Sequence, residues 1–218
     1  MSTPSHNSPA PHNAAPAKFQ AQQAPSIIMS RLKERQDAAY RAKKALTQNF
    51  TATVAKTTAL TQRLYELDVE WVTIRFHRKT TYPIIELFVA FTLCVACGAS
   101  SYRSAITIWQ DIATFIHAAL PKLPVDKADP IKARTPSLEG LHKMLSRMSY
   151  EALEACLKTL EDTRFVSDLQ QVALPKMASI APAEAKSKYA SQSQKLKRDY
   201  FSLMFQNFGL VPLKPEDK

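Results

Sequence analysis

The sequence predicts an all-α fold. Only three glycines, Gly98, Gly140 and Gly209, occur in 218 residues, against fourteen prolines. Strand-rich folds, phosphate-binding loops and dinucleotide-binding turns need glycine wherever the backbone takes a positive φ, so its scarcity argues against all three. Apolar residues recur at helical spacing over long proline-free stretches. A chain of this length can form one or two domains with a sizeable core.

The first element, residues 1–29, is expected to be a disordered arm. Its first 26 residues are rich in Pro, Ala, Ser, Asn and Gln and contain no apolar stretch of the kind found in signal peptides. Two roles are open for this arm. It is either a solubilising tail or a tail that threads between subunits of an assembly.

A long helix is predicted next, from Ser30 to the proline at position 83. One stripe of residues recurs every seven positions and a second follows four positions behind, which is the spacing of a coiled coil. The first third is polar and basic, whereas the later part must be buried. Either another helix of this chain or a second copy could cover it. The residues expected to self-associate in the second case are Leu46, Phe50, Leu60, Leu64, Leu67, Trp71 and Ile74.

The least polar segment comes next: residues 87–102 are sixteen residues without a charge. They follow the basic residues Arg75, Arg78 and Lys79, in the order of a basic collar and a membrane span. The favoured interpretation is one span over residues 84–101, with the N-terminus cytoplasmic. A full span usually needs about 20 apolar residues, so a core helix of a soluble bundle is the alternative. The residues expected in the membrane segment are Ile84, Leu87, Phe88, Val89, Phe91, Leu93 and Val95.

This order of features resembles the small virion membrane proteins of certain plant and insect positive-strand RNA viruses. The resemblance lies in the N-terminal arm, the basic residues and the hydrophobic segment YPIIELFVAFTLCVACGASSYR, residues 82–103. It implies a structural role in a virion or a host membrane. Those proteins are expected to have several spans, whereas nothing after Leu120 is apolar enough for another one.

Residues 104–120 are expected to form an amphipathic helix that lies in a membrane interface or in a bundle. Its apolar face consists of Ile106, Trp109, Ile112, Ala113 and Ile116. Together with the long helix and the hydrophobic helix, it forms a first region, residues 30–120. Four prolines then predict a linker over residues 121–136.

A C-terminal region of about three helices is predicted over residues 137–218. Thr135 is expected to cap the first helix, with Pro136 at its first position, and Ser149 to cap the second. The third is expected to run from Pro182 to Phe208, just before a glycine that suits a helix end.

The net charge of +10 is concentrated in two segments. Residues 31–63 carry +6 and residues 166–218 carry +3, whereas residues 64–165 are neutral. Such segments bind nucleic-acid phosphates or anionic lipid heads, and aromatic residues interleave with the second, as in proteins that bind single strands. The alternative is an amphipathic helix whose lysines are only solvated. The residues expected at such an interface are Arg31, Lys33, Arg35, Arg41, Lys43, Lys44, Lys186, Lys188, Lys195, Lys197 and Arg198.

The sequence contains no recognised catalytic motif. GxSxG, GxxxxGK[ST] and HExxH are absent, and the pair Cys94 and Cys97 lacks the further ligands of a zinc site. We therefore expect no enzyme activity, no cofactor, no metal and no small-molecule substrate.

Two main classes of function are left. The first is a membrane-associated, self-associating structural or assembly protein, such as a virion component, whose partners are further copies and membrane lipids. The alternative is a soluble, all-helical nucleocapsid or coat protein that binds RNA electrostatically. A non-viral scaffold or adaptor is a third class. The expected location is the virion or a host membrane if the protein is viral, and otherwise the cytoplasm or a membrane.

Overall fold

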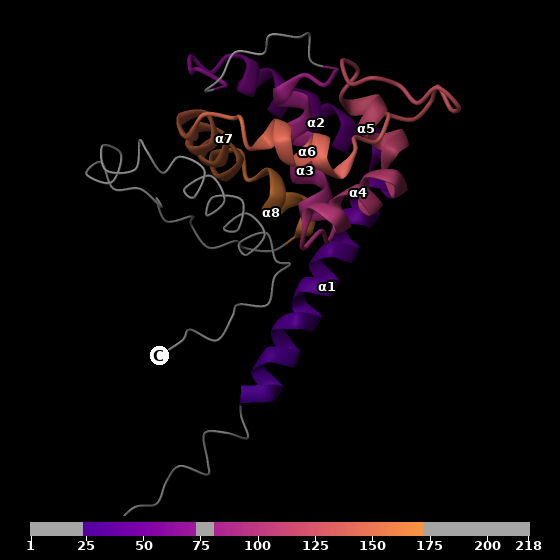
Figure 1. The fold of residues 1–218 in the computed structure, drawn as a ribbon. Coiled ribbons are helices and arrows are strands. Elements are labelled where there is room, and N and C mark those ends of the chain that lie inside the picture. The colour runs from indigo at the N-terminus through magenta and orange to yellow at the C-terminus, as the bar shows by residue number, and fades with distance from the viewer. Residues whose placement is uncertain (1–23, 73–80, 172–218) are drawn as a thin grey trace, which may run out of the picture.

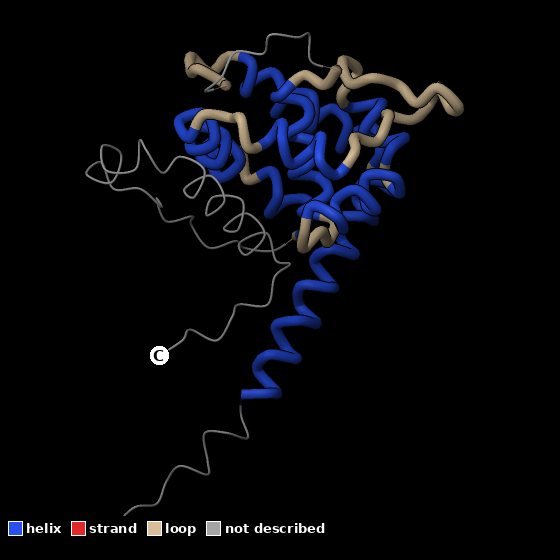
Figure 2. Tube along the Cα trace, in the orientation of Figure 1, coloured by secondary structure: helices blue, strands red, loops and turns tan. Residues whose placement is uncertain are grey.

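The computed structural model describes residues 24–72 and 81–171, and the described part is all-helical, as the sequence predicts. Figures 1 and 2 show these helices packed into one body, from which the first helix projects. No strand occurs among the described residues. The helices are α1 (Ala24–Gln48), α2 (Phe50–Tyr65), α3 (Ile84–Ala96), α4 (Tyr102–Asp111), α5 (Ala113–Ala119), α6 (Leu138–Leu145), α7 (Tyr150–Asp162) and α8 (Phe165–Gln170).

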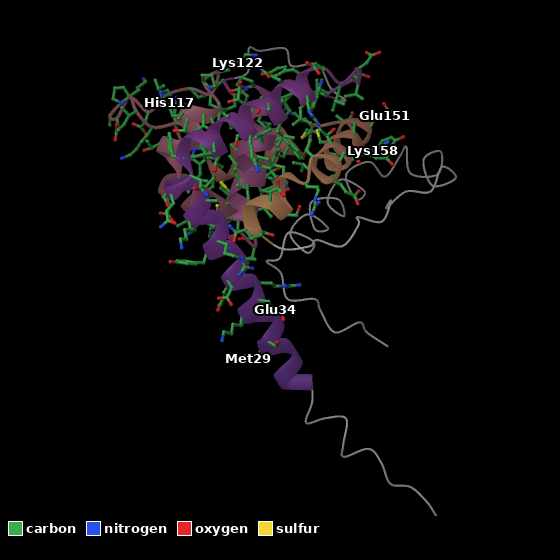
Figure 3. The ribbon with its side chains drawn as sticks, turned by 180° about the vertical axis from the view of Figure 1, so that it is seen from behind. Met29, Glu34, His117, Lys122, Glu151 and Lys158 are labelled. Atoms are coloured by element: carbon green, nitrogen blue, oxygen red, sulfur yellow. The ribbon has the colours of Figure 1, made fainter. Side chains whose placement is uncertain are left out.

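The helix expected to run from residue 30 to the proline at 83 is divided into α1 and α2. Asn49 separates them, with φ −109° and ψ 36°, and the chain changes direction there (Figure 3). α2 then ends at Tyr65, so the last residues of the seven-residue pattern lie beyond it. The predicted arm is also shorter than 29 residues, because α1 begins at Ala24.

α3 lies at the centre of the body. All its side chains from Ile85 to Ala96 are buried, and α2, α4, α6 and α8 pack against it. Of the residues expected in a membrane, Ile84 is half-buried in this fold, and the fully buried ones are Leu87, Phe88, Val89, Phe91, Leu93 and Val95. Among the described helices, none combines the length and the apolar character that a membrane crossing needs.

The apolar seam predicted along the long helix faces this same core. Leu46, Leu60 and Leu64 are buried in it, Leu67 and Trp71 are half-buried against it, and Ile74 lies outside the described residues. Phe50 is exposed on one side, but its ring meets that of Phe115 edge-on, with 5.6 Å between the centroids. Helices of the same chain therefore cover most of the seam, which is one of the two ways of burying it.

The buried threonines of α2, two of which interrupt the seven-residue pattern, are buried at little cost, because each hydroxyl donates a hydrogen bond to a backbone carbonyl. Thr57 donates to the oxygen of Thr53 and Thr61 to that of Thr57, both at 2.8 Å, and Thr53 donates to Ala45 at 3.2 Å. A buried polar group with such a partner loses little stability relative to water.

The amphipathic helix predicted after α3 forms two helices, α4 and α5, that meet at Ile112. Ser101 caps α4: its hydroxyl accepts from the backbone N–H of Ser104, whose own hydroxyl accepts from the Ser101 N–H. Four residues of the predicted apolar face are buried, and Ile106 is half-buried.

The proline-rich segment forms a loop without helix or strand, fixed to the body by a hydrogen bond from the Ala133 N–H to the Ala113 carbonyl at 3.0 Å. The following helix, α6, starts later than predicted. Ser137 caps it instead of Thr135, because the Ser137 hydroxyl reaches the N–H of Gly140 at 3.0 Å. Ser149 caps α7 as predicted, accepting from the Ala152 N–H at 3.0 Å.

The three described C-terminal helices join the same core as the helices before them. α6 packs on α3 and α4, α7 on α2, and α8 on α1 and α3. The buried apolar residues between positions 42 and 169 thus form one continuous hydrophobic core. The helix predicted from Pro182 to Phe208 lies outside the described residues.

Candidate nucleic-acid interface

The feature most clearly set apart from the core is the first part of α1. None of the described side chains from Met29 to Asp37 is buried, and burial begins only with Ala38, Ala42 and Leu46. Residues 24–37, called here the projecting half, therefore extend about 20 Å beyond the body at 1.5 Å per residue (Figures 1 and 3). This helix carries most of the basic residues of the first charged segment.

The second part of α1 is held close to α3 by small residues. Gly98, in the turn after α3, has φ +115°, and a Cβ atom placed on it would lie 3.3 Å from the Cβ of Ala39. Only glycine adopts this backbone conformation readily, and only small side chains let the two segments approach so closely.

Gln170, at the end of α8, ties three elements together. Its side chain is fully buried and donates from Nε2 to the Ala96 carbonyl at the end of α3, at 3.0 Å. Its backbone carbonyl accepts a hydrogen bond from Nε of Arg41 at 2.6 Å. A residue 129 positions away in the sequence therefore orients the guanidinium of Arg41 on α1.

A cleft opens beside Arg41, with a volume of about 360 Å³. It is called here the basic cleft. None of its described lining residues is acidic, whereas two are cationic and three carry amides. The lining residues are Tyr40, Arg41, Lys44, Ala45, Gln48 and Asn49 from α1 and its junction with α2, and Gln171 from the end of α8.

Neighbouring cations on the same surface are already paired. Lys43 lies 3.6 Å from the carboxylate of Asp111 on α4, and Lys56 lies 3.2 Å from that of Asp168 on α8. Among the predicted basic residues, the structure thus brings Arg41 and Lys44 together in the cleft and directs Lys43 to a different partner.

The other predicted basic residues divide into two sets. Lys33 is exposed and Arg35 half-exposed on the projecting half of α1. Six lie outside the described residues or have a side chain outside them: Arg31, Lys186, Lys188, Lys195, Lys197 and Arg198.

The sequence prediction missed the uncharged members of the cleft. Tyr40 is 68% exposed and is the one aromatic residue within the basic stretch 31–44, a signal that the sequence does contain. Gln48, Asn49 and Gln171 gave no such signal, because polar residues at helix ends are common and Gln171 meets α1 only through the fold.

This set of groups suits a nucleotide chain. Guanidinium and ammonium groups bind phosphate oxygens, and an arginine whose fork is already oriented loses less entropy on binding. Side-chain amides bind phosphates, sugars and base edges, and an exposed ring can stack on a base.

The described residues offer no comparable site for covalent or metal chemistry. No three His, Cys, Asp or Glu side chains among them gather closely enough to hold a metal ion. Cys94, Cys97 and Cys156 are buried, and burial raises the pKa of the Cys97 thiol to about 12. A thiol with such a pKa is protonated at neutral pH and is a poor nucleophile.

Comparison with known protein families, with curated protein sequences and with solved structures gave no match. Function must therefore be inferred from the residues of this chain.

Proposed function

We propose that this chain is a non-enzymatic structural protein that binds RNA electrostatically, as a nucleocapsid or coat subunit does. The basic cleft is the observation that carries the proposal. Arg41 and Lys44 line it beside the exposed ring of Tyr40, and no acidic residue is among its described lining. Phosphates supply the affinity of such a site, and a ring that stacks on any base adds little sequence preference.

Two observations favour RNA over a membrane surface as the partner. The apolar side chains of α3 are already covered by helices of the same chain, so the segment considered for a membrane anchor is occupied in the core. The amides and the ring of the cleft match bases and sugars, whereas an anionic lipid head needs only the cations.

The affinity is expected to fall steeply with salt, because each neutralised phosphate releases counterions. For a single strand the slope of log K against log [salt] is about −0.7 per phosphate contact. Removing both cleft cations should therefore reduce the slope by about 1.4 units.

The proposal is tested by fluorescence anisotropy with a labelled single-stranded oligouridylate at several salt concentrations. Arg41→Gln with Lys44→Gln is expected to weaken binding by tenfold or more at low salt and to flatten the salt dependence. Lys127→Gln with Lys158→Gln removes the same charge from exposed sites on the loop and α7, and is expected to change binding less than threefold.

Equal losses in the two double variants would show that only the overall charge attracts RNA and would contradict the cleft proposal. Vesicles containing anionic lipid provide the second arm of the test. Flotation of the protein with these vesicles, combined with no binding to RNA, would favour the membrane-associated structural role over the one proposed here.

A further inference from the structure

The projecting half of α1 leaves apolar side chains in solvent. Met29 is 64% exposed and Leu32 is 38% exposed, and a spacing of three residues places them on one face of the helix. Lys33 is exposed beside them. In proteins most of the stability of a helix comes from packing of an amphipathic face, and a partner surface would supply such packing to this segment.

A surface of matching character follows α2. Residues 66–71 alternate acidic and apolar side chains and are called here the acidic strip. Glu66, Asp68 and Glu70 are exposed, whereas the apolar residues between them are half-buried, so that carboxylates flank partly open apolar surface. The exposed carboxylate of Glu151, at the start of α7, adds to the negative charge nearby.

The acidic strip is fixed in place although it is not a regular element. The backbone N–H of Ser149 donates to the Trp71 carbonyl at 3.0 Å, and the Ser149 hydroxyl donates to the carbonyl of Glu70. An isolated antiparallel β-bridge between Val72 and Met148 continues this contact. The strip is thus a preformed surface, which lowers the entropy lost when a partner binds.

The two surfaces lie at opposite ends of the molecule. In Figure 3, Met29 and Glu34 mark the free end of α1, while Glu151 lies across the body from them. Figure 1 shows the same separation between the start of α1 and the end of α2. The projecting half therefore cannot reach the acidic strip of its own chain.

We infer that the projecting half of α1 docks on the acidic strip of a second copy of this chain. Lys33 meets the carboxylates of the strip, while Met29 and Leu32 cover its half-buried apolar residues. Arg31, two positions earlier in the sequence, adds to the positive charge of this segment. The projecting half carries three basic residues against the acidic Glu34 and Asp37, so its net charge is opposite in sign to that of the strip. Each surface also offers apolar side chains, and this chain alone supplies both surfaces.

The symmetry of the assembly follows from the placement of the two surfaces. A contact between two different surfaces of identical subunits is head-to-tail, and it repeats until a ring closes or a filament grows. This mode of self-association differs from pairing through the seam of α1 and α2, which lies in the core. It also stands apart from the RNA proposal, because it involves no residue of the basic cleft.

Sedimentation velocity of the purified, nuclease-treated full chain tests this inference. The wild-type protein is expected to form species larger than the 24.4 kDa monomer, in amounts that rise with concentration. A helix variant, Arg31→Glu with Lys33→Glu, and a strip variant, Asp68→Lys with Glu70→Lys, are each expected to stay monomeric. Circular dichroism is expected to show that both keep the wild-type helical content.

Mixing the two variants provides the discriminating result. The acidic helix of the first fits the basic strip of the second, and the basic helix of the second fits the acidic strip of the first. An equimolar mixture is therefore expected to recover the wild-type size distribution. As a matched control, Lys127→Glu with Lys158→Glu should assemble as the wild type does.

Three results would overturn the inference. They are a wild-type protein that is monomeric at every concentration, a helix or strip variant that assembles like the wild type, and a mixture of the two variants that stays monomeric. None of them bears on the RNA proposal, because nucleic acid is absent from the assay.

Discussion

Replacing Gly98 by alanine tests how α1 is held against the end of α3. The φ angle of +115° is open to glycine and strained for any residue with a Cβ atom. The new Cβ would also lie 3.3 Å from the Cβ of Ala39 on α1, so the two segments would have to separate by a few tenths of an ångström. Both effects destabilise the folded state.

The backbone strain is the larger of the two. A residue held in a sparsely populated region of φ and ψ costs about 1–3 kcal/mol. For a chain of this size each kcal/mol lowers Tm by about 2–4 °C, so Gly98→Ala is expected to lower Tm by roughly 2–12 °C. The contact with Ala39 adds less, because small shifts of a helix relieve it.

Urea unfolding followed by circular dichroism measures the loss, and a second substitution separates its two causes. Ala39→Gly removes the opposing Cβ atom but leaves φ at position 98 unchanged. The double variant is therefore expected to regain little of the stability lost in Gly98→Ala. Full recovery in the double variant would show that steric contact is the main cause. A loss below about 0.5 kcal/mol in Gly98→Ala would refute the reasoning altogether.

Two further predictions concern buried or bridging side chains. Glu86 is 2% exposed, and burial, the dominant effect, raises its pKa although Lys122 and Tyr65 act in the opposite direction. The ionised carboxylate therefore costs stability at neutral pH, and this cost disappears as the pH falls through the raised pKa. Glu86→Gln should raise the free energy of unfolding most at pH 8, and this gain should shrink as the pH is lowered towards the ordinary carboxyl pKa of 4.5; a gain that does not change with pH would contradict this. Ser149→Ala removes a helix cap and the bond to Glu70, and is expected to cost about 1–2 kcal/mol in urea unfolding, more than the cap variant Ser137→Ala.

The sequence predicted the helical class because that class depends on local properties. Scarce glycine, helical spacing and hydroxyl caps act within a few residues, and Ser149 was placed correctly on that basis. The prediction that Thr135 caps α6 was wrong. Thr135 and Ser137 both carry hydroxyls, and only the folded geometry decides which hydroxyl reaches a free backbone N–H. Local signals fix a helix end within a turn and leave the exact residue to packing.

The seven-residue pattern shows a different limit of prediction from sequence. It marked the correct apolar face from Leu46 to Leu64, but it could not distinguish a partner helix in another copy from helices of the same chain. Periodicity describes one side of an interface, whereas the identity of the partner depends on tertiary contacts. The break at Asn49 was also missed, because no proline or glycine marks the change of direction. Asparagine is a common N-cap residue, but the side chain of Asn49 makes no capping hydrogen bond.

The basic cleft depends both on local sequence and on tertiary contacts. Its charge is local and was predicted, since Arg41 and Lys44 stand in the more basic of the two charged segments. Its shape is not local, because the carbonyl that orients Arg41 and the amide of Gln171 come from the end of α8. The buried side chain of Gln170 holds that end against α3, so this residue links the core to the cleft. A substitution at Gln170 that spares the charge of the cleft should therefore still disturb its geometry, which separates the contribution of shape from that of charge.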